Sequence, residues 1–355
     1  MATGAYKTGG PKAALGNSAG ASEREDLSNY ISLITRSETP FMSSIGKAKA
    51  KATLHEWQTD ELRAPGENIR AEGVDFADIT EATGFRSKLG NNTQIFAEVL
   101  SVSNTKRDVD QAGVADEYAY QLKKKGKEIR RDLEWTMVQS WQSRDGSTST
   151  RKMGGVHAYA DEATVWDAVA SDFASAAASN FTDTFNANGT LVATDAANTE
   201  VSIDLADIDE VMQAIYQEGG NASRVMVSPK NRRTISEAAQ LAGSQNVRRN
   251  IDDSGKLRSS IDIYQSDFGE VMIVPNYIMG TGGVDAAGPL LTGDNPDDYT
   301  AIVYDPQWFK LATLRPLAET DVGPKGDSTI GMLIEECTLE VSNPKGFGLI
   351  VGIGA

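Results

Sequence analysis

Three basic residues stand at the start of a predicted helix, directly after a short apolar strand. Lys230, Arg232 and Arg233 lie in the stretch "YQEGGNASRVMVSPKNRRTIS", residues 216–236. The N-terminus of a helix binds phosphate through its backbone N–H groups, and nearby cations would strengthen such a site. The same cations oppose the helix macrodipole by up to about 1 kcal/mol each. We therefore expect anions beside them, either a bound phosphate or carboxylates of a neighbouring copy of the chain.

Other motifs with known chemistry are incomplete. His55 opens "HEWQT", which lacks the second histidine of a zincin metal site. "GNSAG" at 16–20 matches the nucleophile-elbow pattern but lies in a Gly/Ala-rich segment instead of a strand-to-helix turn. "MGTGGVDAAG" and "GPKGDS" depart from the dinucleotide and P-loop spacings. We expect no catalytic residue, no cofactor and no metal ion, and hence no enzyme.

The chain is strongly acidic. Its 355 residues carry 34 Lys and Arg against 50 Asp and Glu, a formal net charge of −16. This charge repels phosphate, so it disfavours sequence-specific nucleic-acid binding but permits passive proximity to DNA. The single cysteine, Cys337, excludes an internal disulfide and is expected to be a small buried apolar residue. Without a secretory signal or an apolar run of roughly 20 residues, we expect folding in a reducing cytoplasm and no membrane contact.

The N-terminal part predicts an arm and a hairpin. Residues 1–25 are rich in Gly, Ala, Ser and Thr, and we expect an arm that orders only against a partner. A helix-like apolar patch follows over 27–34 and stops near Pro40. Alternation over 54–59 and a returning strand over 91–105 predict a long, mostly polar hairpin with little core of its own.

A helix of some 30 residues, about 45 Å long, is predicted over 110–142. One face is an apolar stripe and the other is basic. Glu128 and Glu134 lie four residues beyond Lys124 and Arg130, so we expect part of the charge to be paired along the helix. The basic face is either a solvated surface or a contact with an acidic neighbour. The stripe comprises Val114, Tyr118, Leu122, Ile129, Leu133, Met137 and Trp141, and the basic face comprises Lys123, Lys124, Lys125, Lys127, Arg130 and Arg131.

The second half mixes helices and strands without regular alternation. Residues 161–200 are rich in Ala, Asn, Ser and Thr, which predicts an insertion or variable loop. An amphipathic helix ends at a glycine pair, a strand over 224–227 leads into a helix over 229–242, and a hairpin turns at 267–269. Short strands follow from residue 301 onward. The fold class is therefore α+β and not a doubly wound sheet.

Several segments occur in an order that is typical of one protein family. They are "TRSETPFMSSIGKAKAKATLHEWQTDEL", "NNTQIFAEVLSVSNT" with "EIRRDLEW", "RKMGGVHAY", "YQEGGNASRVMVSPKNRRTIS", "FGEVMIVPNYIM" and "LRPLAETDVGPKGDSTIGMLIEECTLEVSNP". With these segments the chain resembles the major capsid (head) proteins of tailed bacteriophages over nearly its whole length. None of the segments is an enzymatic signature.

The resemblance implies the tailed-phage major capsid protein fold, also called the Johnson fold. It implies an N-terminal arm at 1–50, an E-loop with flanking strands at 51–105, and a peripheral domain with the spine helix and a variable insertion at 106–218. An axial domain at 219–300 and C-terminal strands returning to the peripheral domain at 301–355 complete it. It also implies self-assembly into pentamers and hexamers, with axial domains central and E-loops over neighbours. These would close an icosahedral head around double-stranded phage DNA.

The resemblance also implies partners. Some family members begin with a long scaffolding region, whereas this chain has a short Gly/Ala-rich arm. We therefore expect a separate scaffolding protein and a portal, and we leave a cement protein open. DNA would be enclosed without sequence-specific binding, in a virion whose head is assembled in the host cytoplasm.

The predicted subunit-interface residues lie in the hairpin and the basic segments. Trp57 is the best anchor and Arg63 the second, since interface energy concentrates in aromatic residues and Arg; packing of Trp57 on its own hairpin is the alternative. Arg232 and Arg233 would meet carboxylates of an adjacent subunit. By the resemblance, the basic loop at 243–260 would lie near the capsomer centre. Its candidate residues are Arg248, Arg249, Lys256 and Arg258.

Two alternatives remain. A nanocompartment shell of the encapsulin type has the same fold and would enclose protein cargo instead of DNA. An α/β nucleotide-binding protein would use residues 219–243 to hold phosphate, with Arg232 as a ligand.

Overall fold

The structure is a computed structural model. It describes residues 36–60, 62, 65–69, 72–73, 86–109, 116–140, 143–147, 150–168, 171–173, 201–242, 262–280, 300–321, 323 and 326–353. The predicted arm at 1–25 and the helix-like patch at 27–34 lie outside the described residues. In the described part, no helix combines the length and the apolar character that crossing a membrane requires.

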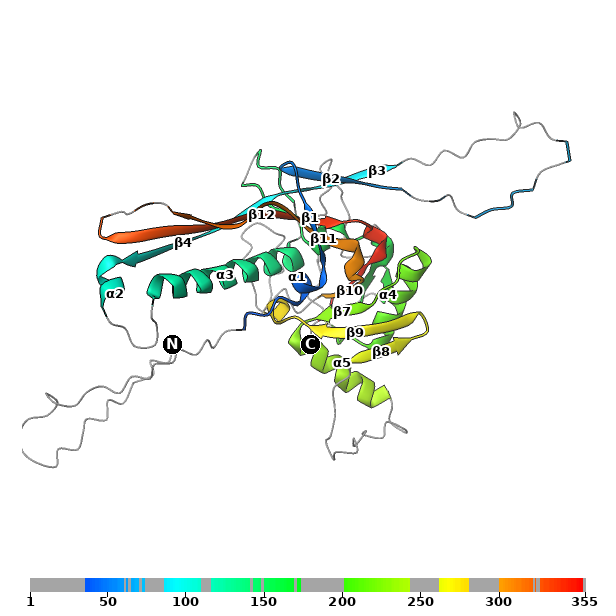
Figure 1. The fold of residues 1–355 in the computed structure, drawn as a ribbon. Coiled ribbons are helices and arrows are strands. Elements are labelled where there is room, and N and C mark those ends of the chain that lie inside the picture. The colour runs from blue at the N-terminus through cyan, green and yellow to red at the C-terminus, as the bar shows by residue number, and fades with distance from the viewer. Residues whose placement is uncertain are drawn as a thin grey trace, which may run out of the picture.

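One sheet packs against a long helix (Figure 1). Its strand order is β1 (Gly46–Lys49), β11 (Phe309–Asp321), β12 (Ser328–Val341) and β4 (Gln94–Ser103). β1 runs parallel to β11, and the other neighbouring strands are antiparallel. Helix α3 (Glu117–Gln139) lies along one face of this sheet, on the side where alternate residues of β4 are buried.

A second sheet gathers strands from distant parts of the chain. Helices α4 (Leu205–Gln217) and α5 (Pro229–Ala242) pack on the same face, because Ile208 and Ile235 share one buried cluster with Val225 of the sheet. The strand order is β6 (Asp172–Phe173), β5 (Val165–Asp167), β13 (Gly348–Val351), β10 (Ala301–Tyr304), β7 (Arg224–Val227), β9 (Gly269–Pro275) and β8 (Ile263–Ser266).

The predicted hairpin is confirmed in its first strand and wrong in its second. β2 (Leu54–Thr59) pairs antiparallel with β3 (Ser87–Asn92), so the returning strand begins earlier than the predicted 91–105. Most of the predicted range forms β4, which pairs with β12 instead. The physical reason is that Phe96 and Leu100 are buried on the face of β4 toward α3, where Phe96 packs in one cluster with Ile129 and Leu133 of that helix.

Short helical segments connect the strands. Helix α1 (Pro40–Ser44) precedes β1, and helix α2 (Asn104–Asp108) follows β4. Short 3₁₀ segments are η2 (Val156–Tyr159), η3 (Glu162–Thr164), η4 (Tyr277–Gly280), η6 (Pro306–Trp308) and η7 (Pro344–Gly346).

Helix α3 is shorter than predicted. It begins after Asp116, whose carboxylate accepts a backbone N–H of the first turn at 2.9 Å, and it ends at Gln139. Its 23 residues span about 35 Å. Residues 110–115 and 141–142 of the predicted range lie outside the described residues. The predicted apolar stripe is confirmed as buried at Ile129, Leu133 and Met137.

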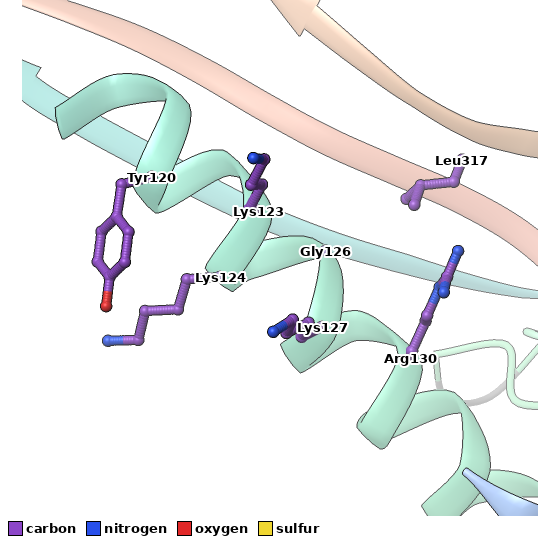
Figure 2. Close-up of a pocket in the computed structure, with 7 residues that line it drawn as sticks. All are labelled: Tyr120, Lys123, Lys124, Gly126, Lys127, Arg130 and Leu317. Carbon is purple, nitrogen blue, oxygen red and sulfur yellow. The ribbon is translucent and has the colours of Figure 1, made fainter. Parts of the chain in front are cut away.

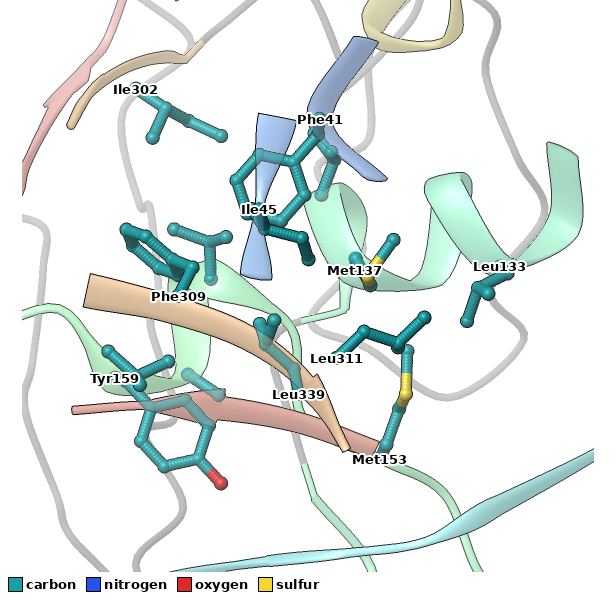
Figure 3. Close-up of a cluster of buried hydrophobic side chains, with 14 of the residues drawn as sticks. Phe41, Ile45, Leu133, Met137, Met153, Tyr159, Ile302, Phe309, Leu311 and Leu339 are labelled. Carbon is teal, nitrogen blue, oxygen red and sulfur yellow. The ribbon is translucent and has the colours of Figure 1, made fainter. Parts of the chain in front are cut away.

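Two buried clusters lie on opposite faces of the second sheet. Met226 and Ile302 belong to the first cluster, whereas their chain neighbours Val225 and Val303 belong to the second, as side-chain alternation along a strand requires. Figure 3 shows the first cluster, where residues of α1, α3, β11 and β12 converge. Cys337 is fully buried in this cluster, which confirms its predicted role, and burial raises the pKa of its thiol.

Most elements predicted for the second half of the chain are confirmed. β7 and α5 coincide with the predicted ranges, and the β8–β9 hairpin turns just before Gly269, whose φ is 148°. The loop prediction for 161–200 is wrong at Val165–Asp167, which is the buried strand β5. This strand is too short to show a periodicity, and its pairing with β13 joins residues far apart in the chain. Residues 174–200 lie outside the described residues.

Candidate functional site

The start of α5 is held by partners within the chain. Ser228 precedes the helix, and its hydroxyl oxygen accepts the backbone N–H of Asn231 at 3.2 Å, as an N-terminal cap does. The Arg232 guanidinium donates to the backbone carbonyl of Ile273 and forms a 2.5 Å ion pair with Asp262. Since one backbone N–H is capped and Arg232 is engaged, the geometry does not favour a phosphate cradle.

The second arginine of this cluster also has a partner on its own chain. Arg233 pairs with Glu237, one helical turn further on, at 2.7 Å. The expectation that phosphate or a neighbouring copy supplies the compensating anions is therefore wrong for Arg232 and Arg233. The partner of Arg232 was not predictable from spacing because Asp262 lies 30 residues away, whereas Glu237 lies at the helical spacing of four from Arg233 and could have been predicted. Contact of either arginine with another subunit stays a prediction.

Trp57 anchors the β2–β3 hairpin on the body of its own chain. Its ring lies against Tyr159, with 5.9 Å between ring centroids, and against His55 at 5.8 Å. The His55 ring nitrogen Nε2 is 2.9 Å from a carboxylate oxygen of Glu340. The alternative that Trp57 packs on its own hairpin holds for its contact with His55, but the ring also lies against Tyr159, which is outside the hairpin. A contact with a neighbour stays a prediction.

The remaining predicted interface residues cannot be placed. They lie outside the described residues and are Arg63, Arg248, Arg249, Lys256 and Arg258.

Neither histidine has the surroundings of a metal ligand. His55 is engaged by Glu340, and His157 is fully buried with its Nε2 3.3 Å from the hydroxyl of Thr300. Burial lowers the pKa of His157 to about 4, so this side chain is neutral at pH 7. Across the residues that the structure covers, no three His, Cys, Asp or Glu side chains gather as a metal site requires.

A cationic groove runs along α3 beside β11. It has a volume of about 430 Å³, and its cationic side chains are exposed. Figure 2 shows Lys123 and Arg130 pointing to the side of the helix where Leu317 of β11 lies, whereas Lys124 and Tyr120 point away from it. We call this surface the α3 groove. Its lining residues are Tyr120, Lys123, Lys124, Gly126, Lys127, Arg130 and Leu317.

The positive charge of the α3 groove is only partly balanced. Lys124 lies 4.0 Å from Glu128, but that carboxylate makes a shorter pair with Lys125 at 2.8 Å. Within the described ranges, Lys123 and Lys127 have no carboxylate at ion-pairing distance. The predicted local pairing is therefore confirmed only for the weaker contact of Lys124.

The second predicted pair on this helix is wrong. Glu134 does not pair with Arg130 but is fully buried at the C-terminal end of α3. Its carboxylate accepts the backbone N–H groups of Phe41 at 2.8 Å and Met42 at 2.7 Å, and the side-chain amide of Asn276 at 2.9 Å. Burial raises the pKa of Glu134 to about 7, against the lowering effect of these three donors. Glu134 thus joins α1, α3 and the segment after β9.

Comparisons with known proteins agree on one family. The family model of the SU10 major capsid protein matches residues 6–354. A major capsid protein of Escherichia phage Phieco32 is 29% identical over 255 residues, covering 65% of this chain and 70% of the relative.

Solved structures with a similar fold come from capsids and from an encapsulin. The capsid structure of the Cyanophage P-SCSP1u aligns with a TM-score of 0.54 at 12% identity, covering 94% of this chain and 93% of the other. The holo-SrpI encapsulin complex from Synechococcus elongatus aligns with a TM-score of 0.50 at 9% identity, covering 89% and 88%. At these identities the likeness concerns the fold alone, and it confirms the predicted α+β capsid protein fold.

Proposed function

The chain belongs to the SU10 major capsid protein family, and on this premise we propose that its copies assemble into pentamers and hexamers that close an icosahedral head around double-stranded DNA. Its role is that of a shell-forming structural protein of a virion. The observation that carries the proposal is the family match over residues 6–354 of a 355-residue chain. The family role is structural, and we infer that the chain has no enzymatic activity.

The β2–β3 hairpin supports an E-loop that lies over a neighbouring subunit. Beyond β2, Leu62 has an exposed fraction of 99%, although an apolar side chain gains free energy when it leaves water. Trp57 packs on Tyr159 and so fixes the base of the hairpin on the chain's own body. Arg63, next to Leu62, is the polar candidate for the same contact.

We assign the domains as the family fold implies. The N-terminal arm is 1–50, the E-loop 51–105, the peripheral domain 106–218, the axial domain 219–300 and the C-terminal strands 301–355. Strands of the last three segments share one sheet, because β10 pairs with both β7 and β13, and β13 pairs with β5. This sharing supports a rigid connection between the axial and peripheral parts.

The other partners are also proposals. A separate scaffolding protein would direct assembly in the host cytoplasm, and a portal would occupy one vertex. A cement protein is an open option. The acidic chain, with its net charge of −16, would enclose DNA without binding a specific sequence. The basic residues Arg248, Arg249, Lys256 and Arg258 would line the capsomer centre.

Electron microscopy tests the proposed function. Full-length protein, alone and with a scaffolding protein, is expected to form capsomers or closed shells, with matching sizes in light scattering. Leu62→Asp should reduce assembly without changing the unfolding transition of the subunit, whereas the control Leu62→Met should assemble normally because it keeps the apolar contact. A chain that stays monomeric under every condition, scaffold included, would overturn the proposal.

The same particles separate the alternatives. Protein cargo in place of DNA would favour the encapsulin type of shell, whose fold this chain shares. A nucleotide-binding role predicts micromolar affinity in calorimetry that Arg232→Ala abolishes. Because Arg232 is already bound to Asp262 and to the carbonyl of Ile273, we expect no nucleotide binding in calorimetry.

A further inference from the structure

The α3 groove concentrates positive charge in an acidic chain. Lys123, Lys124, Lys127 and Arg130 fall within eight consecutive residues, and Lys123 and Lys127 have no carboxylate partner in the described part. The groove also has apolar lining, from Leu317 of β11 beside Arg130 and from Tyr120 on the other side of the helix. Such a surface fits a segment that carries both carboxylates and apolar side chains.

The start of the described chain lies at one end of this groove. Glu134 of α3 holds the backbone of Phe41 and Met42, and it stands one helical turn beyond Arg130. The chain that precedes Pro40 therefore begins beside the Arg130 end of the groove. Any segment before α1 is tethered there, which gives it an effective concentration in the millimolar range.

The sequence before α1 has the matching chemistry. Among residues 1–35, the only carboxylates are Glu23, Glu25 and Asp26, and they are clustered. Large apolar residues follow between Leu27 and Ile34. In the sequence, the apolar residues stand nearest to α1 and the carboxylates stand further from it. The groove has the same order, because Leu317 and Arg130 lie near α1 and the lysines lie further along α3.

The tether is long enough for this contact. Asp26 precedes Phe41 by 15 residues, which reach about 22 Å as a helix and about 50 Å when extended. From Glu134 back to Lys123 is 11 residues of α3, about 16 Å. The carboxylates can therefore reach the lysines in either conformation.

We propose that residues 23–34 dock in the α3 groove of the same chain, with the carboxylates of Glu23, Glu25 and Asp26 against its lysines and the apolar residues toward Leu317. A segment with apolar side chains uses both sides of the groove, whereas the phosphates of DNA would use only the cations. Exposed ion pairs are individually weak and screened by salt, so the docked state opens as ionic strength rises.

Limited proteolysis tests the docking. Chymotrypsin should cut slowly after Tyr30 in the full-length protein, and about tenfold faster in Lys123→Glu/Lys127→Glu, because cleavage reports the open population. Adding Glu25→Lys and Asp26→Lys to that variant should restore protection. The control Lys230→Glu/Arg233→Glu makes the same charge change on α5, away from the groove, and should leave the cleavage rate unchanged. Equal rates in all variants would overturn the proposal.

A disulfide pair tests which chain supplies the segment. The native Cys337 is fully buried and does not compete. Oxidised Asp26→Cys/Lys127→Cys should give an internally linked monomer on a non-reducing denaturing gel, whereas Asp26→Cys/Lys230→Cys should stay reduced. Links between chains would overturn docking within one chain in favour of a neighbouring copy, and absence of any link would overturn the docking itself.

Discussion

Oε1 of Glu134 accepts the backbone N–H of Phe41 at 2.8 Å across 93 residues of sequence. Helix α1 has no side-chain cap of its own, since Thr39 at its N-cap position makes no capping hydrogen bond. The carboxylate of a different helix therefore satisfies the N–H groups that α1 leaves open. The spine helix and the start of the N-terminal segment are thus joined by one buried side chain.

Removing this carboxylate should destabilise the subunit strongly. Glu134→Ala leaves three buried donors without an acceptor, on Phe41, Met42 and Asn276, and we expect a loss of about 3 kcal/mol or more in the free energy of unfolding. Denaturant unfolding of the dissociated subunit measures it. Glu128→Gln on the exposed side of the same helix is the control, and its cost should stay below about 1 kcal/mol. Equal costs for the two variants would contradict the capping role.

The same residue should make stability depend on pH. Burial raises the folded-state pKa of Glu134 to about 7, above the 4.5 that is usual for a glutamate side chain. The folded chain then holds the proton more tightly than the unfolded chain, so this contribution is full below pH 4.5 and is lost as pH rises to about 7. The loss is about 3 kcal/mol over that window. A carbon-detected titration of the Glu134 side chain gives the pKa directly, and a midpoint near 4.5 would contradict the prediction.

His157 should act in the opposite direction. Burial lowers its pKa from 6.5 to about 4, so the unfolded chain takes up the proton first as pH falls. Its contribution to stability is full above pH 6.5 and is lost progressively down to about pH 4, by about 3 kcal/mol. Because this slope opposes that of Glu134, single variants are needed to see either one. In His157→Gln, stability should fall less on acidification than in the unsubstituted chain; parallel curves would refute the assignment.

Local chemistry made several elements predictable from the sequence. Asp204 and Asp207 form a capping box at the start of α4, and the glycine pair that ends this helix includes Gly219, whose φ is 85°. Ser228 and Pro229 likewise mark the start of α5. In each case the signal lies within a few residues of the feature that it predicts.

Features that depend on distant residues were not predictable in the same way. Glu134 stands four residues beyond Arg130, so the spacing rule for helical ion pairs predicts a pair between them. That rule considers only residues of one helix and cannot predict a contact with the distant backbone of Phe41. Strand β5 is too short to show a period, and it becomes core only through its pairing with β13. Trp57 looked free to meet a neighbour because Tyr159 lies about a hundred residues away. The overall architecture was predicted from the family resemblance, whereas these long-range contacts are visible only in the structure.

A buried charge cluster at Glu336 should be a second point of fragility. Its carboxylate accepts hydrogen bonds from the hydroxyl of Thr93 at 2.9 Å, from Arg315 at 2.8 Å and from Arg151. The carboxylate is nearly fully buried, so Glu336→Ala strands these donors and should cost about 3–5 kcal/mol. Arg315→Ala should cost less than about 1 kcal/mol, because that side chain is half exposed. Denaturant unfolding of the two single variants and the double variant, combined in a double-mutant cycle, measures both losses of stability. Equal losses for Glu336→Ala and Arg315→Ala would contradict the central role of the Glu336 carboxylate.

Gly155, which packs against the C-terminal end of α3, and Gly126, which lies within this helix, should respond oppositely to alanine. A Cβ at Gly155 would lie 2.4 Å from the carbonyl oxygen of Met137 and 2.7 Å from that of Thr136, so backbone must move and we expect a loss of about 3 kcal/mol. Gly126 lies inside α3 with nothing within 4 Å of its added Cβ, so Gly126→Ala should stabilise by about 0.5–1 kcal/mol. Thermal unfolding of the dissociated subunit distinguishes them by the sign of the shift. A stabilising Gly155→Ala would mean that the C-terminal end of α3 and η2 do not pack as closely as described.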